Sequence, residues 1–526
     1  MGMRSILAAA LVAVQLGAPL AAGAETPQRG GTLVFGVGGE PNTLDCHATN
    51  TFAVLHYVAP HYSTLLRYDP EAYPRIVGDV AASWTSSDDR LTWTFRLRED
   101  VVFHDGTPLT ATDVKATLER LRTPPPGVVS VRKAQFSDIA AIETPDSRTL
   151  IVTLAAFDAS FEAKMASPWN CIYSAARLAS DPEYPHRRVM GTGPFVFADY
   201  QQGKAWNGRR FDRYHHAGQP YLDGFQAVPV EGPSMVNALA AGHLQAEFRG
   251  VTPAQRDRII AARGDKVRFH EGDRISVYVV ALNTQRPPFD DVRVRRALTL
   301  ALDRRAGQAT MTRISSVRTA GGFLRPGSPM AATPAELAAA PGFGPDVQAA
   351  RVEARRLLAE AGQGQLKVRL ISRSIENPHQ QIAVFLIDQW RQIGVTTDHQ
   401  KLETGPWQAT LQAGNFDAIT DFSADPVDDP TIQLERFTSF DRAPNNASRA
   451  IDRTLDDLFE RQRRSADPAA RRELVRRFED RLLEQAYTIP LFWAVRIIPV
   501  ASEVQGWPFS PSHFLFQDLA TVWIRK

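Results

Sequence analysis

One apolar run, Ile275–Leu282, limits what this chain can fold into more than any other segment. A strand with apolar residues at successive positions has both faces buried, which is typical of a sheet covered by helices on both sides. The next third of the chain alternates helical and strand patterns: a helix capped by Asp346, a strand at Lys367–Ser372, and a helix that begins at Asn377-Pro378. We therefore predict an α/β fold.

An earlier region has the pattern of a mixed α+β unit. Apolar and polar residues alternate over Leu91–Leu97, which predicts a half-buried antiparallel strand. Thr110 and Asp113 then have the spacing of a capping box, and apolar residues recur at helical spacing as far as Leu121.

The length and charge of the chain restrict its class. Its 526 residues are too many for one hydrophobic core, so we expect two or three lobes. The 60 basic residues are balanced by 58 acidic residues without a long basic run, which argues against nucleic-acid binding. No stretch after the N-terminal one reaches about 18 apolar residues, so no transmembrane helix is expected.

The N-terminus has the pattern of a secretory signal peptide. Arg4 precedes the apolar run Ile6–Leu20, and Ala22-Gly23-Ala24 follows with small residues at the positions that a signal peptidase needs. We expect cleavage after Ala24, which removes residues 1–24 and places the mature protein in a bacterial periplasm. No cysteine lies near the cleavage point, so no lipid anchor is expected.

The chain has only two cysteines, Cys46 and Cys171. In an exported protein they can form one disulfide or remain two buried thiols, and the sequence leaves both alternatives open.

The segment Asn415–Pro430 predicts a strand that ends in an acidic loop containing Asp425, Asp428 and Asp429. Trp407 lies upstream, at the head of a short helical piece. An acidic loop at the end of a buried strand, with an indole nearby, can hold a cationic or hydrogen-bonding ligand. The alternative is a solvated turn, because aspartate and proline are ordinary turn residues.

The common catalytic and cofactor motifs are absent from the sequence. There is no nucleophile elbow, Walker phosphate loop, Gly-x-Gly-x-x-Gly or His-Glu-x-x-His. Twelve histidines are scattered, and the adjacent His215 and His216 are interpreted as solvated. We expect no catalytic residues, no metal and no cofactor. The acidic loop leaves a secreted hydrolase as the alternative from another class.

Several segments occur in an order that resembles one family. They are Gly31-Thr32-Leu33, Asn42-Thr43-Leu44-Asp45, Leu91–Arg122 with Phe103–Ala111, Gly191–Phe195, Tyr221–Gly224, Ala238–Gly242, Leu282-Asn283-Thr284, Val292–Asp303 and Ile393-Gly394-Val395. The set resembles the extracytoplasmic solute-binding proteins of peptide/nickel-type ABC transporters, the dipeptide- and oligopeptide-binding group known as solute-binding protein family 5.

The resemblance implies a two-lobed periplasmic binding protein fold, type II-like and of the large peptide-binding class, with an extra α+β domain inserted in the first lobe. The lobes would close on ligand by rotation about a hinge near Ile275–Leu282 and Tyr487–Phe492. The implied domains are residues 25–59, 181–274 and 489–526 for the first lobe, 60–180 for the inserted domain and 275–488 for the second lobe.

The resemblance also implies ligand-binding residues. Asp425 would take the amino group of the ligand, with Asp428 as the fallback and Asp429 pointing to solvent. Arg373 would take the ligand carboxylate, and Trp407 would lie beside the ligand. The cleft would be lined further by His47, Thr49, Asn50, Phe52 and Phe323.

The implied function is capture of a small peptide or amine-bearing solute by a monomeric receptor, which delivers it to ABC permease subunits in the inner membrane. Asn207–Phe211 lacks the Arg-Asn pair usual in the family. A metal chelate, an opine or an oligosaccharide therefore remains an alternative solute.

Overall fold

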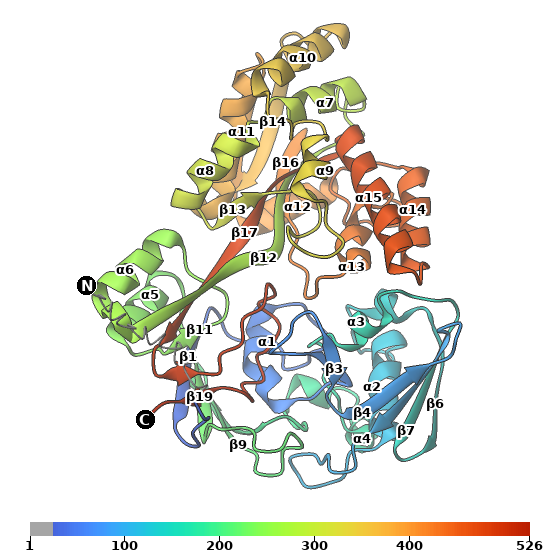
Figure 1. Ribbon diagram of the computed structural model, residues 1–526, viewed down its shortest axis with the longest axis vertical. Helices are drawn as coiled ribbons and strands as arrows, with labels where there is room; N and C mark the ends of the chain where they lie inside the picture. Colours follow the sequence, from blue (N-terminus) through green and yellow to red (C-terminus); the bar gives the residue numbers. More distant parts are fainter. Residues whose placement is uncertain (1–24) are drawn as a thin grey trace, which may run out of the picture.

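The computed structural model describes residues 25–526 as two lobes joined by two long strands (Figure 1). These are β12 (Val267–Leu282) and β17 (Thr488–Ala501), which run antiparallel to each other. The expected signal peptide lies outside the described residues. Within residues 25–526, no helix has the length and apolarity needed to span a bilayer.

One large sheet runs through both lobes. Its strand order is β15-β14-β16-β12-β17-β11-β1-β10-β9-β8, and β13 pairs with β17. The first-lobe strands are β1 (Thr32–Val37), β8 (Phe195–Gln201), β9 (Ala205–Arg210), β10 (Gly224–Pro229) and β11 (Ala246–Glu247). The second-lobe strands are β13 (Val317–Ala320), β14 (Lys367–Arg373), β15 (Thr396–Leu402) and β16 (Ala418–Phe422).

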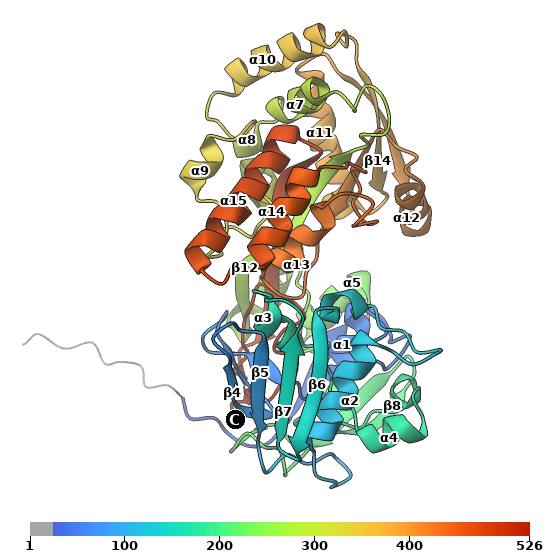
Figure 2. The same cartoon turned by 90° about the vertical axis from the view of Figure 1, so that its right-hand side faces the viewer.

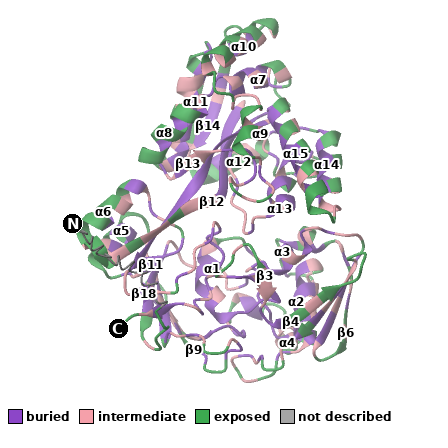
Figure 3. Ribbon diagram, in the orientation of Figure 1, coloured by how far each residue is buried: buried purple, intermediate pink, exposed green. Residues whose placement is uncertain are grey.

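Helices cover both faces of the sheet in the second lobe, as the apolar run predicts. Val280 and Leu282 of β12 pack in a cluster with residues of α7 (Val292–Leu300) and α11 (Gln381–Arg391). Val277 and Val279 point the other way, into a cluster with α14 (Arg453–Arg463) and α15 (Pro468–Gln485). Figure 3 shows the resulting buried band along β12 and β17. The predicted α/β class is confirmed.

The inserted unit has its own sheet and core (Figure 2). The strand order is β4 (Ala81–Ser86), β5 (Thr92–Leu97), β7 (Thr149–Leu154) and β6 (Ile139–Asp146). Trp93, Phe95 and Leu97 are buried, so the predicted alternation is confirmed. The capping box of Thr110 and Asp113 opens α2 (Ala111–Arg122), also as predicted.

The remaining helices are α1 (Phe52–Val58), α3 (Phe161–Met165), α4 (Ala175–Ser180), α5 (Gly232–Ala241), α6 (Pro253–Arg263), α8 (Arg304–Ile314), α9 (Pro334–Ala338), α10 (Val347–Glu360), α12 (Thr404–Ala413) and α13 (Pro430–Leu434). The remaining strands are β2 (Leu66–Tyr68), β3 (Ile76–Gly78), β18 (Val504–Gln505) and β19 (Trp523–Ile524). Helix α11 begins later than Asn377-Pro378 indicates, because Asn377 has an extended backbone inside the preceding turn. The domain boundaries implied by the resemblance stay a prediction.

The two long strands are irregular where they pass between the lobes. Asp273 pairs with Val495, but the next paired residue of β12 is Val277, opposite Trp493. The extra residues bend the strand and leave it locally unpaired. The amide of Ile275 donates instead to the Pro511 carbonyl at 3.0 Å. This irregularity overlaps the start of Ile275–Leu282, where the resemblance implies a hinge.

Candidate functional site

A cleft of about 620 Å³ lies between the lobes, beside the irregular part of β12. The first lobe contributes Phe52 and residues around β11 and α5. The second lobe contributes the end of β14, the turn before α11 and Phe422. Arg274, Tyr278 and Val495 of the two joining strands form its base. Ligands of open α/β sheets commonly bind beyond the carboxyl ends of the strands. The end of β14 that lines the cleft is such a carboxyl end.

Three arginines from different elements face this cleft. Arg249 follows β11, Arg274 lies in the irregular part of β12, and Arg373 ends β14. Among the described residues none of the three forms a salt bridge. Arg274 Nη2 contacts His513 Nε2 at 3.4 Å, and Arg373 Nη2 donates to Thr404 Oγ1 at 2.7 Å. Their positive charges are therefore available to a ligand.

The electrostatics of the cleft follow from these arginines. Burial raises the pKa of Tyr278, while Arg274, Arg373 and Arg249 oppose that rise, so its hydroxyl senses all three charges. Burial and the nearby Arg249 lower the pKa of Arg274 to about 10. Burial, with a contribution from Arg373, lowers the pKa of His379 to about 4, so that imidazole is neutral. Three arginines and two acids, Glu231 and Glu247, therefore set the charge of the cleft.

Aromatic rings hold two of the arginines in place. The guanidinium carbon of Arg249 lies 3.9 Å from the ring centre of Phe52. The guanidinium of Arg373 lies 5.6 Å from Trp407 and 5.9 Å from Phe422. Such cation–π contacts restrict the orientation of a charge without neutralising it.

The structure brings some of the expected ligand residues together. Arg373 and Phe52 line the cleft. Trp407 is 4% exposed and lies behind Arg373 as part of a small hydrophobic cluster. The amide of Asp425 donates to Ile275 O at 3.3 Å, which sets Asp425 beside the irregular part of β12 rather than in the cleft wall. Burial raises the pKa of Asp425 to about 7, and its Oδ2 has no hydrogen-bond partner among the described residues.

Four other expected ligand residues do not line this cleft. His47 is buried, contacts Arg120 at 3.0 Å, and has its pKa lowered to about 3, mainly by burial. The Thr49 carbonyl and the Asn50 side chain accept hydrogen bonds from Arg132 at 2.7 and 2.6 Å. Phe323 is 1% exposed and packs on Phe437. Each has a contact away from this cleft, and a role of these four residues in ligand binding stays a prediction.

The two other aspartates of the acidic loop are also engaged within the protein. Asp428 accepts hydrogen bonds from Arg325 at 2.8 and 2.6 Å, so it is not a free fallback for Asp425. Asp429 does not point to solvent as expected. It caps α13 through the Thr431 amide and pairs with Arg471 at 2.9 Å. Pro430 at the first helical position explains why the helix begins there.

No sequence pattern singles out Arg249, and only the place of Arg274 beside a strand pattern marks it. An arginine in a loop, or one next to a buried strand, resembles the many solvated arginines of this chain. Only the fold shows that both face the same cleft as Arg373. A charged residue interrupting the long strand pattern just before Ile275–Leu282 was the single available hint.

Cys46 and Cys171 are joined by a disulfide, with their Cα atoms 6.1 Å apart and a sequence separation of 125. The bond links the segment after β1 to the segment after α3. Of the two alternatives that the sequence left open, the structure has the bridge.

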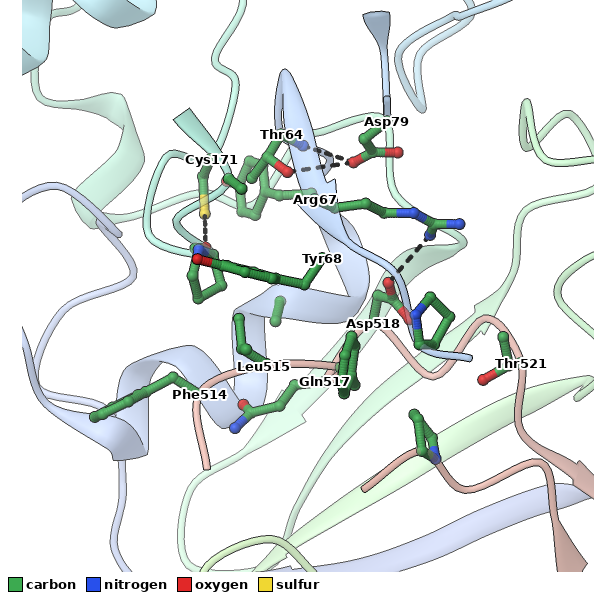
Figure 4. Close-up of a pocket in the computed structure, with 17 residues that line it drawn as sticks. Thr64, Arg67, Tyr68, Asp79, Cys171, Phe514, Leu515, Gln517, Asp518 and Thr521 are labelled. Atoms are coloured by element: carbon green, nitrogen blue, oxygen red, sulfur yellow. Dashed lines mark hydrogen bonds and ion pairs between the residues drawn. The ribbon is translucent and has the colours of Figure 1, made fainter. Parts of the chain in front are cut away.

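His215 and His216 are not solvated, contrary to the sequence interpretation. Their Nε2 atoms lie 3.0 and 3.1 Å from Asp79 Oδ1, and His215 is 6% exposed. Asp79 also lines a separate cavity of about 70 Å³ between the first lobe and the inserted unit, shown in Figure 4. That space suits a few water molecules rather than a solute. The three side chains lie close enough to hold a metal ion, but Arg67 places a positive charge beside Asp79.

Comparison with known proteins identifies the class. The family described as bacterial extracellular solute-binding proteins, family 5 (middle) matches residues 75–444. The chain therefore belongs to this family, whose members are binding proteins rather than enzymes, and the predicted resemblance is confirmed.

Individual relatives cover nearly the whole chain. The glutathione-binding protein GsiB of Escherichia coli (strain K12) is 25% identical over 497 residues, 92% of this chain and 94% of the relative. Heme-binding protein A of Haemophilus influenzae is 26% identical over 462 residues, 82% of this chain and 81% of the relative.

Solved structures agree with the fold. The periplasmic binding protein AgaA from A. tumefaciens R10, in complex with agropinic acid, has a TM-score of 0.78 at 27% identity and covers 94% of this chain and 99% of its own. DppA from Helicobacter pylori, in complex with the peptide STSA, has a TM-score of 0.78 at 21% identity, with 95% and 99% covered, and supports the fold alone. The chain has the two-lobed fold of a peptide-type solute-binding protein.

Proposed function

We propose that this protein is the periplasmic receptor of an ABC importer for a small solute that carries a carboxylate. The solute enters the cleft, the lobes rotate about the irregular part of β12 and β17, and the closed receptor delivers its cargo to permease subunits in the inner membrane. The protein acts as a monomer and performs no catalysis.

The observation that carries this proposal is the position of Arg373. Its guanidinium lines the cleft, is held by Thr404 and by the Trp407 and Phe422 rings, and has no acidic partner among residues 25–526. A guanidinium binds a carboxylate through two parallel hydrogen bonds, a strong and specific arrangement.

A second charged group, Asp425, is not in the cleft wall but contacts Ile275, the neighbour of the cleft residue Arg274. Asp425 has an unpartnered carboxylate oxygen beside the hinge, with a pKa raised by burial. A ligand ammonium would stabilise the ionised carboxylate. An amine-bearing organic acid, as in a small peptide or an opine, therefore fits better than a neutral sugar.

The relatives support the same chemistry. The names of GsiB, heme-binding protein A and the AgaA complex refer to glutathione, heme and agropinic acid, which are all organic acids. A small peptide remains the leading solute, and an opine is the second candidate because of the similarity to AgaA.

Identification of the natural cargo tests the proposal. The full chain would be exported in a Gram-negative host, purified from the periplasm without denaturant and measured by native mass spectrometry. We expect a monomer whose mature N-terminus is Glu25 and which releases a small organic acid. A protein that releases no solute and is not stabilised by any organic acid would contradict the proposal. Turnover of peptides or glycosides would instead support the hydrolase alternative.

A further inference from the structure

We infer that the solute carries two anionic groups, one received by Arg249 and Arg274 and the other by Arg373. This inference rests on the proposed function and narrows it from a solute with a carboxylate to a diacid. It follows from the distribution of charge over the two walls of the cleft.

The first anionic subsite is formed by Arg249 and Arg274. Phe52 lies against the guanidinium of Arg249, 3.9 Å from its central carbon, and thereby fixes its position. Arg274 Nε is buried without a hydrogen-bond partner among the described residues. The two arginines are close enough that Arg249 contributes to the lowered pKa of Arg274. An anion between them would relieve this repulsion and satisfy the unpartnered nitrogen.

The surrounding groups do not neutralise this pair. Burial holds the pKa values of His56 and His513 well below the usual range, so both imidazoles are uncharged. Glu247 is the nearest buried acid, and burial raises its pKa. Its carboxylate accepts the backbone amides of Arg249, at 2.9 Å, and Gly250, and it offsets only part of the positive charge of Arg249 and Arg274.

Two further charges border this side of the cleft. Glu231 lies at the start of α5 and moderates the lowered pKa of Arg249. Arg496 adds positive charge underneath, with its guanidinium donating to carbonyls that include Ser512 at 3.1 Å. The first-lobe wall keeps an excess of positive charge after both acids are counted.

The second anionic subsite is Arg373, across the base of the cleft. Its Nε is buried without a partner in the part of the chain that the structure describes. Tyr278 lines the cleft together with both subsites, and the charges of Arg249, Arg274 and Arg373 all act on its hydroxyl. Both subsites line the same cleft of about 620 Å³, so one solute can contact both.

When the lobes close on a solute, the balance between its charge and the arginine charges determines how tightly it binds. A single carboxylate pairs with one fork of N–H groups and leaves the arginine of the opposite wall without a counter-ion. When the lobes exclude water, an unpaired buried charge is strongly unfavourable. A diacid neutralises both walls, whereas its monoamide does not, so the cleft selects against the amide.

Matched ligands and matched variants test this inference. The probes are a dipeptide ending in glutamate against the same dipeptide ending in glutamine, and glutathione against its glycine carboxamide. The variants are Arg249→Gln and Arg249→Lys, with Arg258→Gln as the control. Arg258 is exposed on α6 and donates to Asn237, outside the cleft. Calorimetric titration gives affinities, and thermal melts without ligand verify folding.

We expect the parent protein to bind a diacid about 30-fold or more tightly than the matched amide. Arg249→Gln should remove this preference, Arg249→Lys should keep part of it, and Arg258→Gln should keep it fully. Equal binding of diacid and amide, or an unchanged preference in Arg249→Gln, would overturn the inference.

If no probe binds, the solute released from the native protein tests the inference instead. A released solute with two ionised acidic groups supports the inference. A released solute with a single ionised acidic group overturns the inference and leaves the proposed function in place. If no solute is released and none stabilises the protein, both fail.

Discussion

The guanidinium of Arg373 lies 5.6 Å from the ring centre of Trp407, with Thr404 holding one of its nitrogens. The indole is almost fully buried, so it supports Arg373 from behind and leaves the cleft-facing side of the guanidinium free. The buried indole of Trp407 therefore restricts the orientation of the charged Arg373 side chain.

Replacing Arg373 by glutamine should weaken solute binding severely. Truncating one partner of a buried charged pair typically costs about 2–5 kcal/mol. Arg369→Gln is the matched control, because Arg369 lies on the same strand but bonds Asn415 outside the cleft. Titration with the released solute measures both variants. Similar affinities for the two variants would contradict the assignment of Arg373.

Trp407→Phe should lower affinity by less than Arg373→Gln, because the smaller ring still packs behind the guanidinium. Trp407→Ala should in addition destabilise the second lobe by about 3–5 kcal/mol, the usual cost of removing a large buried aromatic side chain. Urea unfolding without solute separates the two effects. A Trp407→Phe variant that binds no solute although it is as stable as the parent would show direct contact with the solute.

Asp425 should make stability depend on pH in an unusual direction. Its pKa in the folded protein is raised by burial to about 7, above the ordinary value of 3.8. The folded state therefore binds more protons than the unfolded state between these values, and stability contributed by the neutral carboxyl is lost as the pH rises from about 4 to 7. Asp425→Asn should stabilise the solute-free protein at pH 8, by at most about 4 kcal/mol, and should change little at pH 4.

The same carboxyl gives a test for an ammonium in the solute. If a ligand ammonium pairs with Asp425, binding at pH 6 must release a proton, because the pair requires the ionised carboxylate. Calorimetry in two buffers of different ionisation enthalpy measures that release. Asp425→Asn should abolish it. Proton uptake, or no proton exchange in the parent protein, would exclude the ammonium pair.

Removing the disulfide should destabilise the protein without removing its binding residues. The bond closes a long loop, so loss of both cysteines as Cys46→Ala with Cys171→Ala should cost about 2–5 kcal/mol. Denaturation with and without reductant measures the effect. The parent should show no free thiols when alkylated under non-reducing denaturing conditions. Two alkylated thiols would mean that the bridge is not formed.

Asp138 should contribute to the closed arrangement of the lobes. This residue of the inserted unit pairs with Arg463 and, at 3.1 Å, with Arg464 of the second lobe. Asp138→Ala should weaken solute binding by about 1 kcal/mol or less, since the groups are only partly buried. Asp441→Ala is the control, because it breaks the Asp441–Arg453 pair within the second lobe. X-ray scattering should show a more open solute-free Asp138→Ala protein, and an unchanged profile would contradict this role.

The sequence was most informative where a local pattern determines the structure. The strand Lys367–Ser372, the alternation around Phe95 and the capping box of Thr110 are set by nearby residues, and all three are present in the structure. The resemblance to a family predicted the two-lobed architecture, because the order of many weak motifs is specific even when each motif is not.

The sequence was least informative where distant residues decide the role of a side chain. Asp429 looked solvated, but Arg471, far along the chain, pairs with it. His47 looked accessible in a polar stretch, but Arg120 and Cys171 surround it in the fold. Arg249 and Arg274 are recognised as candidate ligand residues only because the fold places them in the same cleft as Arg373. Long-range partners cannot be read from local composition.

The position of β17 in the chain affects the order in which the protein can fold. This strand pairs with β12 through both lobes, yet it follows every other strand of the large sheet in sequence. Neither lobe can complete its sheet until β17 has been synthesised, so the chain must bring together segments that are far apart in sequence, which is slow. Such a delay would favour secretion, because a chain that folds late is still extended when the export machinery engages it.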